Sequence, residues 1–141
     1  MKSYPDNVFE KLVLLVRNDE DLDREWLLNN RCRELVEFLD AIDGIEKSFQ
    51  WLLDNNYRQL AATVDAMNGN SKAKVFLLQS GNRELAAFVD ACTGNQNAVS
   101  WLVTYGHKGW VLVAREFFEK DKKKNKGGFW GLFNLGNPYS S

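Results

Sequence analysis

Charged residues recur in this chain at a fixed spacing, and their types could do chemistry. The series consists of Arg33, Arg58 and Arg83 together with Asp40, Asp65 and Asp90. Three aligned carboxylates could form a track for a metal ion or a cationic peptide. The same charges could instead cap helices, because each arginine opens and each aspartate closes a helical pattern, against the favourable direction of the helix dipole. We expect the capping role, in which each charge faces the opposite pole of a neighbouring antiparallel helix.

Cross-capping of this kind predicts definite contacts. The three aspartate carboxylates should accept hydrogen bonds from amides near residues 45–47, 70–72 and 95–97, where the next helix begins. The three arginines should reach the terminal carbonyls of the preceding helix.

A second group of candidate residues lies at the C-terminal end of the chain. Residues 120–126 (KDKKKNK) carry a charge of +4, and the uncharged segment GGFWGLFNLGNPYSS follows them. The glycines disfavour a stable helix, yet the segment is too apolar for an idle tail. The candidates for contact with a partner are Phe129, Trp130, Leu132, Phe133, Leu135 and Tyr139.

Three roles for this tail stay open. It could fold back over the apolar end of a helical array, since such arrays need a cap. It could insert into another copy of the chain or into another protein. It could also rest on an anionic membrane surface, where both lysines and interfacial aromatic residues bind.

Four aromatic residues occupy equivalent places along the chain, namely Trp26, Trp51, Phe76 and Trp101. They could form a stacking platform for bases or peptide side chains. We expect them to pack in the core or between neighbouring helices, because a leucine follows each of them and no stripe of phosphate-binding lysines accompanies them.

Residues typical of catalytic or metal sites are otherwise sparse. The single His107 and the two cysteines, Cys32 and Cys92, show neither zinc-ligand spacing nor a disulfide framework. The sequence has no Walker loop, G-x-S-x-G elbow or G-x-G-x-x-G fingerprint. We therefore expect a protein that is not an enzyme and needs no cofactor or metal, with Cys92 as a small core residue.

Charge and hydropathy restrict the partners further. The 141 residues carry 18 basic and 19 acidic side chains, a net charge of −1, so residues 1–119 carry −5 once the lysine run is set apart. No general basic field favours nucleic acid. The longest early apolar run, 12–16, is too short for a membrane span or a signal peptide, so we expect a cytoplasmic protein.

The elements that must position these residues form an internal repeat of 25 residues. RQLAATVDAMNGNSKAKVFLLQSGN begins at Arg58, RELAAFVDACTGNQNAVSWLVTYGH begins at Arg83, and nearly half their positions match. Earlier copies start at Arg33 and near Val8, and a half copy follows the last one. Apolar residues recur at helical spacing within each copy, so each copy is a pair of short helices.

Helix ends follow from turn residues. Gly44, Gly69 and Gly94 should end the first helix of a pair, while Asn70 and Asn95 should start the second. The predicted helices span 6–17, 21–30, 32–42, 46–55, 58–67, 71–80, 83–92, 96–105 and 108–119.

These helices are too short to be stable alone, so they must stack. Leu52, Leu77 and Leu102 should form an apolar ladder through the stack. The predicted fold is an all-α solenoid, or superhelix, of about four and a half antiparallel helical pairs over residues 1–119, followed by the tail at 120–141.

The segment AAFVDACTGN at 86–95, with echoes at 61–70 and 36–44, resembles uncharacterised bacterial proteins built of short tandem helical pairs. The resemblance covers about residues 8–118. It implies a binding scaffold by analogy alone, and the unit is shorter than tetratricopeptide, ankyrin or HEAT repeats, whose ligands therefore cannot be carried over.

The function that we expect is a non-catalytic scaffold for protein–protein interaction, with possible self-association through the tail. The alternative is a peripheral membrane or assembly protein that is anchored through the tail.

Overall fold

The computed structural model describes residues 2–128, with side chains as far as residue 123, and this part of the chain contains nine helices and no strand. The helices are α1 (Asp6–Asn18), α2 (Asp21–Asn29), α3 (Arg33–Ile42), α4 (Glu46–Asp54), α5 (Arg58–Met67), α6 (Ser71–Gln79), α7 (Arg83–Ala91), α8 (Gln96–Thr104) and α9 (Lys108–Gly128). The all-α prediction is confirmed, and the predicted bounds of the first eight helices hold to within about one residue.

The last helix is longer than predicted. α9 runs to Gly128 instead of ending near residue 119, so the lysine run begins inside a helix. Lysine is a good helix former, and glycine is common at helix C-termini, so the two glycines that end α9 are compatible with it. Residues 129–141, which include all six candidate tail residues, lie outside the described part of the chain.

Each helix from α2 to α8 ends in the same pair of backbone hydrogen bonds. At the end of α3, the amide of Ile45 donates to the carbonyl of Asp40, and the amide of Gly44 donates to the carbonyl of Ala41. Gly44 has a φ of +95°, which glycine adopts without strain. This is the Schellman motif, and it turns the chain tightly enough for the next short helix to pack antiparallel.

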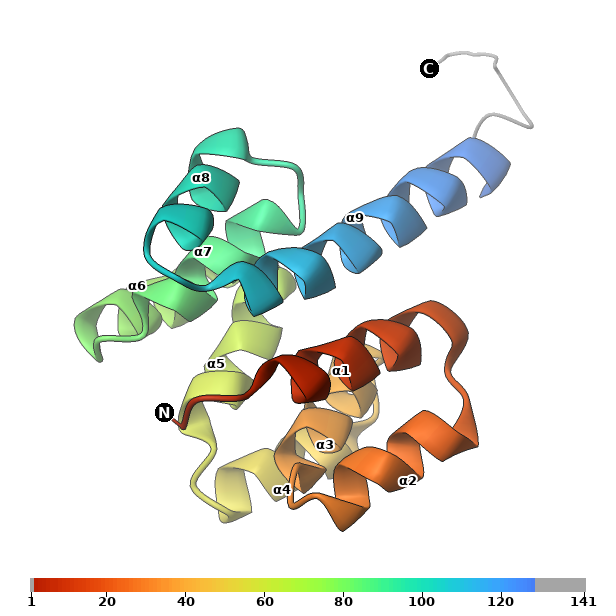
Figure 1. Cartoon of the computed structure of the whole chain (residues 1–141). Helices are drawn as coiled ribbons and strands as arrows, with labels where there is room; N and C mark the ends of the chain where they lie inside the picture. Colours follow the sequence, from red (N-terminus) through yellow and green to blue (C-terminus); the bar gives the residue numbers. More distant parts are fainter. Residues whose placement is uncertain (1, 129–141) are drawn as a thin grey trace.

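The odd-numbered helices form the inner layer of the molecule. α3, α5, α7 and α9 pack side by side in that order, while α2, α4, α6 and α8 make their main contacts with the helices next to them in sequence and lie outside (Figure 1). The predicted ladder residues Leu52, Leu77 and Leu102 are fully buried between the two layers. The contiguous series of helices agrees with the predicted repeat arrangement.

The curvature of the array brings its two ends together. α1 packs along α9, although the two helices lie at opposite ends of the described sequence (Figure 1). Trp110 of α9 fills the centre, with ring centroids 5.2 Å from Phe9, 5.1 Å from Phe88 and 6.5 Å from Phe38. The apolar face of the last helix is therefore covered by the first helix.

A buried carboxylate fastens the N-terminal segment to this core. Glu34 of α3 is only 2% exposed, and its Oε2 accepts from the hydroxyl of Tyr4 and pairs with Nζ of Lys2, both at 2.7 Å. Burial, followed by the bond to Glu34, raises the pKa of the Tyr4 hydroxyl above its ordinary value. The two partners supply the compensation that a buried carboxylate needs.

Candidate protein-binding surface

The three aspartates of the charge series do not cap the following helices as predicted. The amides of Ile45, Asn70 and Asn95 donate to the main-chain carbonyls of the aspartates, as part of the Schellman turns. The carboxylates of Asp40 and Asp90 instead pair with cations from the preceding helix. Because a Schellman turn already satisfies the first amide after the helix, the carboxylate stays available for a side chain.

The cation partners occupy equivalent places in the repeat. Nη1 of Arg24 on α2 donates to Asp40 at 2.9 Å, and Nζ of Lys74 on α6 donates to Asp90 at 2.6 Å. Each pair joins the second helix of one copy to the first helix of the next. The hydrogen bond to Asp40 outweighs the opposing effect of burial and raises the pKa of Arg24.

The arginines of the series also lie elsewhere than predicted. The guanidinium of Arg33 stands 4.7 Å from the ring centroid of Trp51, and that of Arg83 stands 4.9 Å from the ring centroid of Trp101. Within residues 2–128, no hydrogen bond joins the side chains of Arg33, Arg58 or Arg83 to a carbonyl of the preceding helix. All three arginines are exposed, and Arg33 and Arg83 lie beside aromatic rings that attract cations.

Four grooves recur where consecutive copies meet, and we call them the first to fourth junction grooves. Each is lined by the end of one inner helix, the start of the following outer helix and the end of the next inner helix. The second groove, for example, joins Gly44, Phe49 and Asp65, and the third joins the equivalent Gly69, Lys74 and Asp90. Their volumes are 50, 420, 550 and 260 Å³ in chain order.

The chemistry of the four grooves differs at one pair of positions. Arg24, which lines the first groove, pairs with the adjacent Asp40, and the third groove holds the pair of Lys74 and Asp90. The second has Phe49 and Asp65 in these places, and the fourth has Val99 and Arg115. The grooves therefore share a shape and differ in charge.

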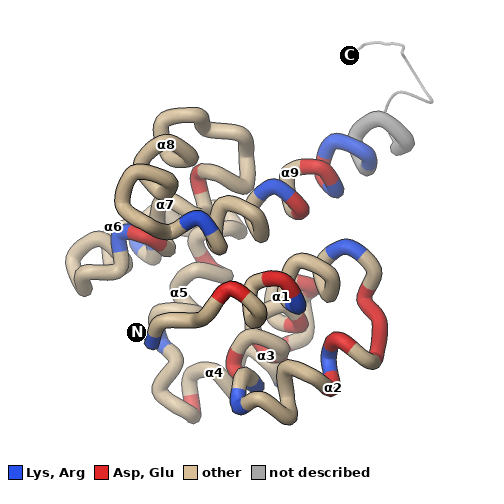
Figure 2. Tube along the Cα trace, in the orientation of Figure 1, with Lys and Arg blue, Asp and Glu red and all other residues tan. Residues whose placement is uncertain are grey.

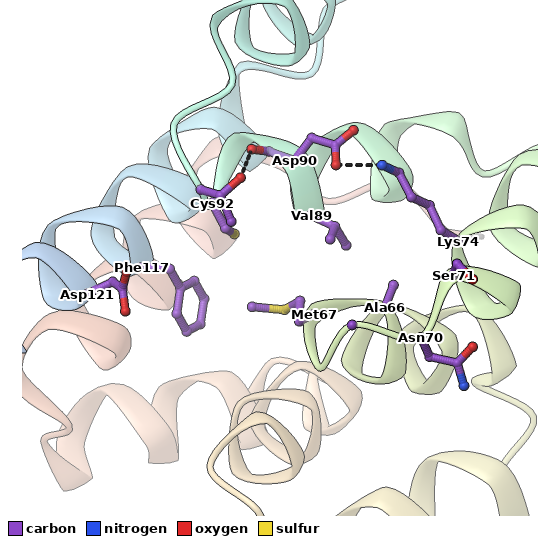
Figure 3. A pocket seen from close by; sticks show the side chains of 12 residues that line it. Ala66, Met67, Asn70, Ser71, Lys74, Val89, Asp90, Cys92, Phe117 and Asp121 are labelled. Carbon is purple, nitrogen blue, oxygen red and sulfur yellow. Dashed lines mark hydrogen bonds and ion pairs between the residues drawn. The ribbon is translucent and has the colours of Figure 1, made fainter. Parts of the chain in front are cut away.

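The third groove illustrates the shared geometry (Figure 3). Met67 and Phe117 extend into it from opposite sides, and Lys74 reaches across its rim to the carboxylate of Asp90. Cys92 lies at its inner wall, where burial raises the pKa of the thiol well above the ordinary value of 9.0. Cys92 is a small buried residue, as predicted, and the groove offers an apolar floor with a charged rim.

A regular row of exposed apolar residues runs over the outer helices. One residue from each of α2, α4, α6 and α8 contributes, and the exposed fractions lie between 40% and 55%. We call this row the outer ladder, and it consists of Leu28, Leu53, Leu78 and Val103. The sequence prediction named only the buried leucines that precede them, Leu52, Leu77 and Leu102. The signal that could have separated them is the run of three apolar residues, which is wider than one helical stripe.

A groove between α6 and α8 extends the outer ladder. Leu78 and Trp101 form its sides, Ala86 and Ala87 of α7 form its floor, and the groove has a volume of 490 Å³. Arg83, which lies over Trp101, borders the same groove. Small residues in the floor and large residues at the sides leave a hollow that a protruding side chain can enter.

The repeated aromatic residues are only partly buried. Trp26, Trp51 and Trp101 pack against the core with part of each ring exposed, and Phe76 is 38% exposed. Trp51 stacks on Tyr57, and Trp101 stacks on His107. They pack between neighbouring helices, as expected, and they also contribute to the outer surface.

Candidate catalytic and metal-binding groups are dispersed in the described structure. Cys32 and Cys92 are both buried and unpaired. Among residues 2–128, no group of three His, Cys, Asp or Glu side chains is placed to hold a metal ion. In the same range, no helix combines the length and apolar character needed to cross a bilayer.

The chain matches no protein-family model, no curated protein and no solved structure. This agrees with the sequence analysis, which assigned the chain to no characterised family.

Proposed function

We propose that this protein is a non-catalytic helical scaffold that binds another protein through its outer face. The observation that carries the proposal is the outer ladder, in which an apolar residue of each outer helix is exposed at the same place of every copy. Exposing such residues repeatedly brings no gain in folding, so a binding role accounts for their regular placement.

The residues beside the outer ladder suit a protein interface. Trp51 and Trp101 are held in place by Tyr57 and His107 and carry the guanidinium groups of Arg33 and Arg83 on their faces. Tryptophan, tyrosine and arginine supply much of the binding energy at protein interfaces. α4 and α8 therefore each supply an aromatic ring and an exposed aliphatic residue, and the preceding inner helix adds an arginine over the ring.

The test uses a double substitution on the outer ladder, Leu53→Glu with Leu78→Glu, in the full chain. The matched control is Leu22→Glu, because Leu22 is 77% exposed on α2 but does not belong to the outer ladder. Proteins captured by the wild-type chain from its native cell are purified and titrated one at a time by calorimetry. We expect a partner whose affinity falls at least about tenfold with the double variant and is retained by the control.

Two results would overturn the proposal. One is that no purified protein binds the wild-type chain. The other is that every partner binds the double variant as tightly as the control, while circular dichroism shows both variants folded.

The second candidate function is attachment to a membrane surface through α9 and the tail. Its support is that α9 extends past the helices that flank it and carries Lys120, Lys122 and Lys123 there (Figures 1 and 2). Flotation with vesicles containing phosphatidylserine tests this function. Binding should require residues 120–141 and should weaken with salt, and equal flotation of intact and truncated chains would exclude it.

We also propose that the protein works in the cytoplasm. Two buried, unpaired cysteines are compatible with a reducing compartment, where thiols stay reduced. Fractionation of the native cell, with the protein detected by antibody, tests this location.

A further inference from the structure

The second junction groove departs from its neighbours at two positions, and both changes remove polar contacts. Phe49 stands where the first and third grooves have Arg24 and Lys74, so Asp65 has no cation of its own. Ile45 stands where the third and fourth grooves have an asparagine that caps the next helix.

The charge balance of this groove differs accordingly. Its lining contains two carboxylates, Glu46 and Asp65, and no lysine or arginine, whereas each of the other three is lined by at least one basic residue. Within the described part of the chain, no ion pair involves Asp65. The groove therefore carries an uncompensated negative charge beside an aromatic ring.

The neighbouring copies show which kind of side chain pairs with the repeated aspartate. Beside the first groove, which has a volume of 50 Å³, the side chain of Arg24 donates to Asp40 at 2.9 Å. In the third, the ammonium group of Lys74 reaches Asp90 at 2.6 Å. The second groove has the same backbone turn and the same aspartate, and its open volume of 420 Å³ compares with 550 Å³ in the third groove, which holds its own cation. A basic side chain of a partner protein would supply the ion pair that Arg24 and Lys74 form within the chain in the other two copies.

Ile45 indicates what surrounds that basic side chain. It is 47% exposed at the edge of the groove and makes no cap for α4, although asparagine at the equivalent positions 70 and 95 accepts from the amides of Ala73 and Ala98. The copy thus lacks a stabilising cap and exposes an apolar side chain instead. An exposed Ile45 next to Phe49 favours an apolar neighbour beside the incoming charge.

We infer that the second junction groove binds a lysine or arginine side chain of a partner protein, flanked by apolar residues, with the Asp65 carboxylate as the acceptor and the Phe49 ring as the wall. This inference rests on the proposed scaffold function and specifies the chemistry of the partner. A carboxylate and an aromatic face together bind a guanidinium or ammonium group by a charge-assisted hydrogen bond and a cation–π contact.

The probe is the capped tripeptide acetyl-Leu-Arg-Leu-amide, titrated into the full chain and followed by amide chemical shifts. Its control is the same tripeptide with citrulline, which keeps the shape of arginine and lacks its charge. We expect saturable shifts at Ile45, Phe49, Asp65 and Asn68 with the arginine peptide, and binding at least about tenfold weaker with the citrulline peptide.

Three variants test the assignment of the groove. Asp65→Asn should weaken binding about tenfold, and Phe49→Lys should abolish it by supplying an internal cation. Lys74→Phe should remove the internal cation of the third groove and add a second set of shifts around Asp90. Thermal unfolding of each variant shows whether the fold is retained, and the gain of a site by Lys74→Phe cannot result from unfolding.

Several results would overturn the inference. They are absence of shifts at the solubility limit of the peptide, equal binding of the citrulline peptide, and unchanged binding by Asp65→Asn. A concentration-dependent shift at Asp65 without peptide would show that a second copy of the chain occupies the groove, and would also overturn it. If the peptide fails to bind while the outer-ladder variant still loses a partner, this inference fails and the scaffold function stands.

Discussion

Arg17 and Glu116 lie 99 positions apart in the sequence and form a bidentate ion pair that joins the first helix to the last described helix. Nε of Arg17 donates to Oε1 of Glu116 at 3.1 Å, and Nη2 donates to Oε2 at 2.8 Å. The pair lies on the surface where α1 packs along α9. It therefore reports directly on the closure of the helical array.

The pH dependence of this closure should have a definite sign. The hydrogen bond to Arg17 outweighs the opposing effect of burial and holds the pKa of Glu116 below its ordinary value of 4.5. A carboxyl whose pKa is lower in the folded than in the unfolded state stabilises the fold above its unfolded pKa and loses that effect as the pH falls through the folded pKa. We expect Glu116→Gln to lower the melting temperature at pH 7, and the gap to wild type to narrow below pH 4.5.

The matched control for that experiment is Glu119→Gln, since Glu119 is exposed on the same helix and forms no ion pair within the described residues. The melting temperature of Glu119→Gln should equal that of the wild-type protein at neutral and at acidic pH. A gap between Glu116→Gln and wild type that stays constant down to pH 3 would contradict the prediction.

Trp110 should be the most sensitive position of the core. Its ring is 4% exposed and contacts aromatic rings of α1, α3 and α7. We expect Trp110→Ala to cost about 3–5 kcal/mol of unfolding free energy, measured by urea titration, because the cavity opens at the meeting point of four helices. Tyr105→Ala is the control, since Tyr105 is 63% exposed, and it should change the free energy by less than about 1 kcal/mol. A similar loss for the two variants would refute the central role of Trp110.

Gly94 and Gly69 occupy the same turn of consecutive copies but should respond differently to alanine. Both have left-handed φ angles, +91° and +94°, so each substitution should cost about 1–2 kcal/mol. A Cβ atom at Gly94 would also lie 2.8 Å from the ring of Phe118, whereas nothing lies within 4 Å of the same atom at Gly69. We expect the lower melting temperature for Gly94→Ala, and equal melting temperatures would contradict the packing of Phe118 on this turn.

Ile45→Asn should stabilise the protein. Asn70 and Asn95 accept from amides three residues further on at 3.1 and 3.0 Å, and asparagine at position 45 can make the same bond to the amide of Ser48. The expected gain in unfolding free energy is about 1 kcal/mol, measured by urea titration. Ile45→Ala serves as the control, because it removes the same apolar side chain without supplying a cap. If the two variants are equally stable, the cap does not form.

The positions of the helices could be predicted from the sequence because their signals are local. A Schellman turn depends on hydrogen bonds between residues at most five positions apart, and on one residue that tolerates a positive φ. Gly69 and Asn70 are adjacent, so the sequence indicates in two residues where one helix ends and the next one begins. The end of α9 could not be read in this way, because a lysine-rich segment is compatible with both a helix and an extended tail.

The partners of the charges could not be predicted, because those partners belong to other helices. Asp40 and Asp65 look alike in the sequence, and only packing shows that Arg24 neutralises one while Phe49 stands beside the other. The same holds for Leu52 and Leu53, of which the first is buried and the second is 40% exposed.

The sequence by itself determined the repeat, the ends of the first eight helices and the burial of Leu52, Leu77 and Leu102, since these follow from spacing and from turns closed within a few residues. Only the tertiary structure decided that α1 meets α9 and that one junction groove lacks a cation. The reason is that closure depends on a small rotation added at every copy. That rotation arises from packing across the whole array, and no single segment of the sequence encodes it.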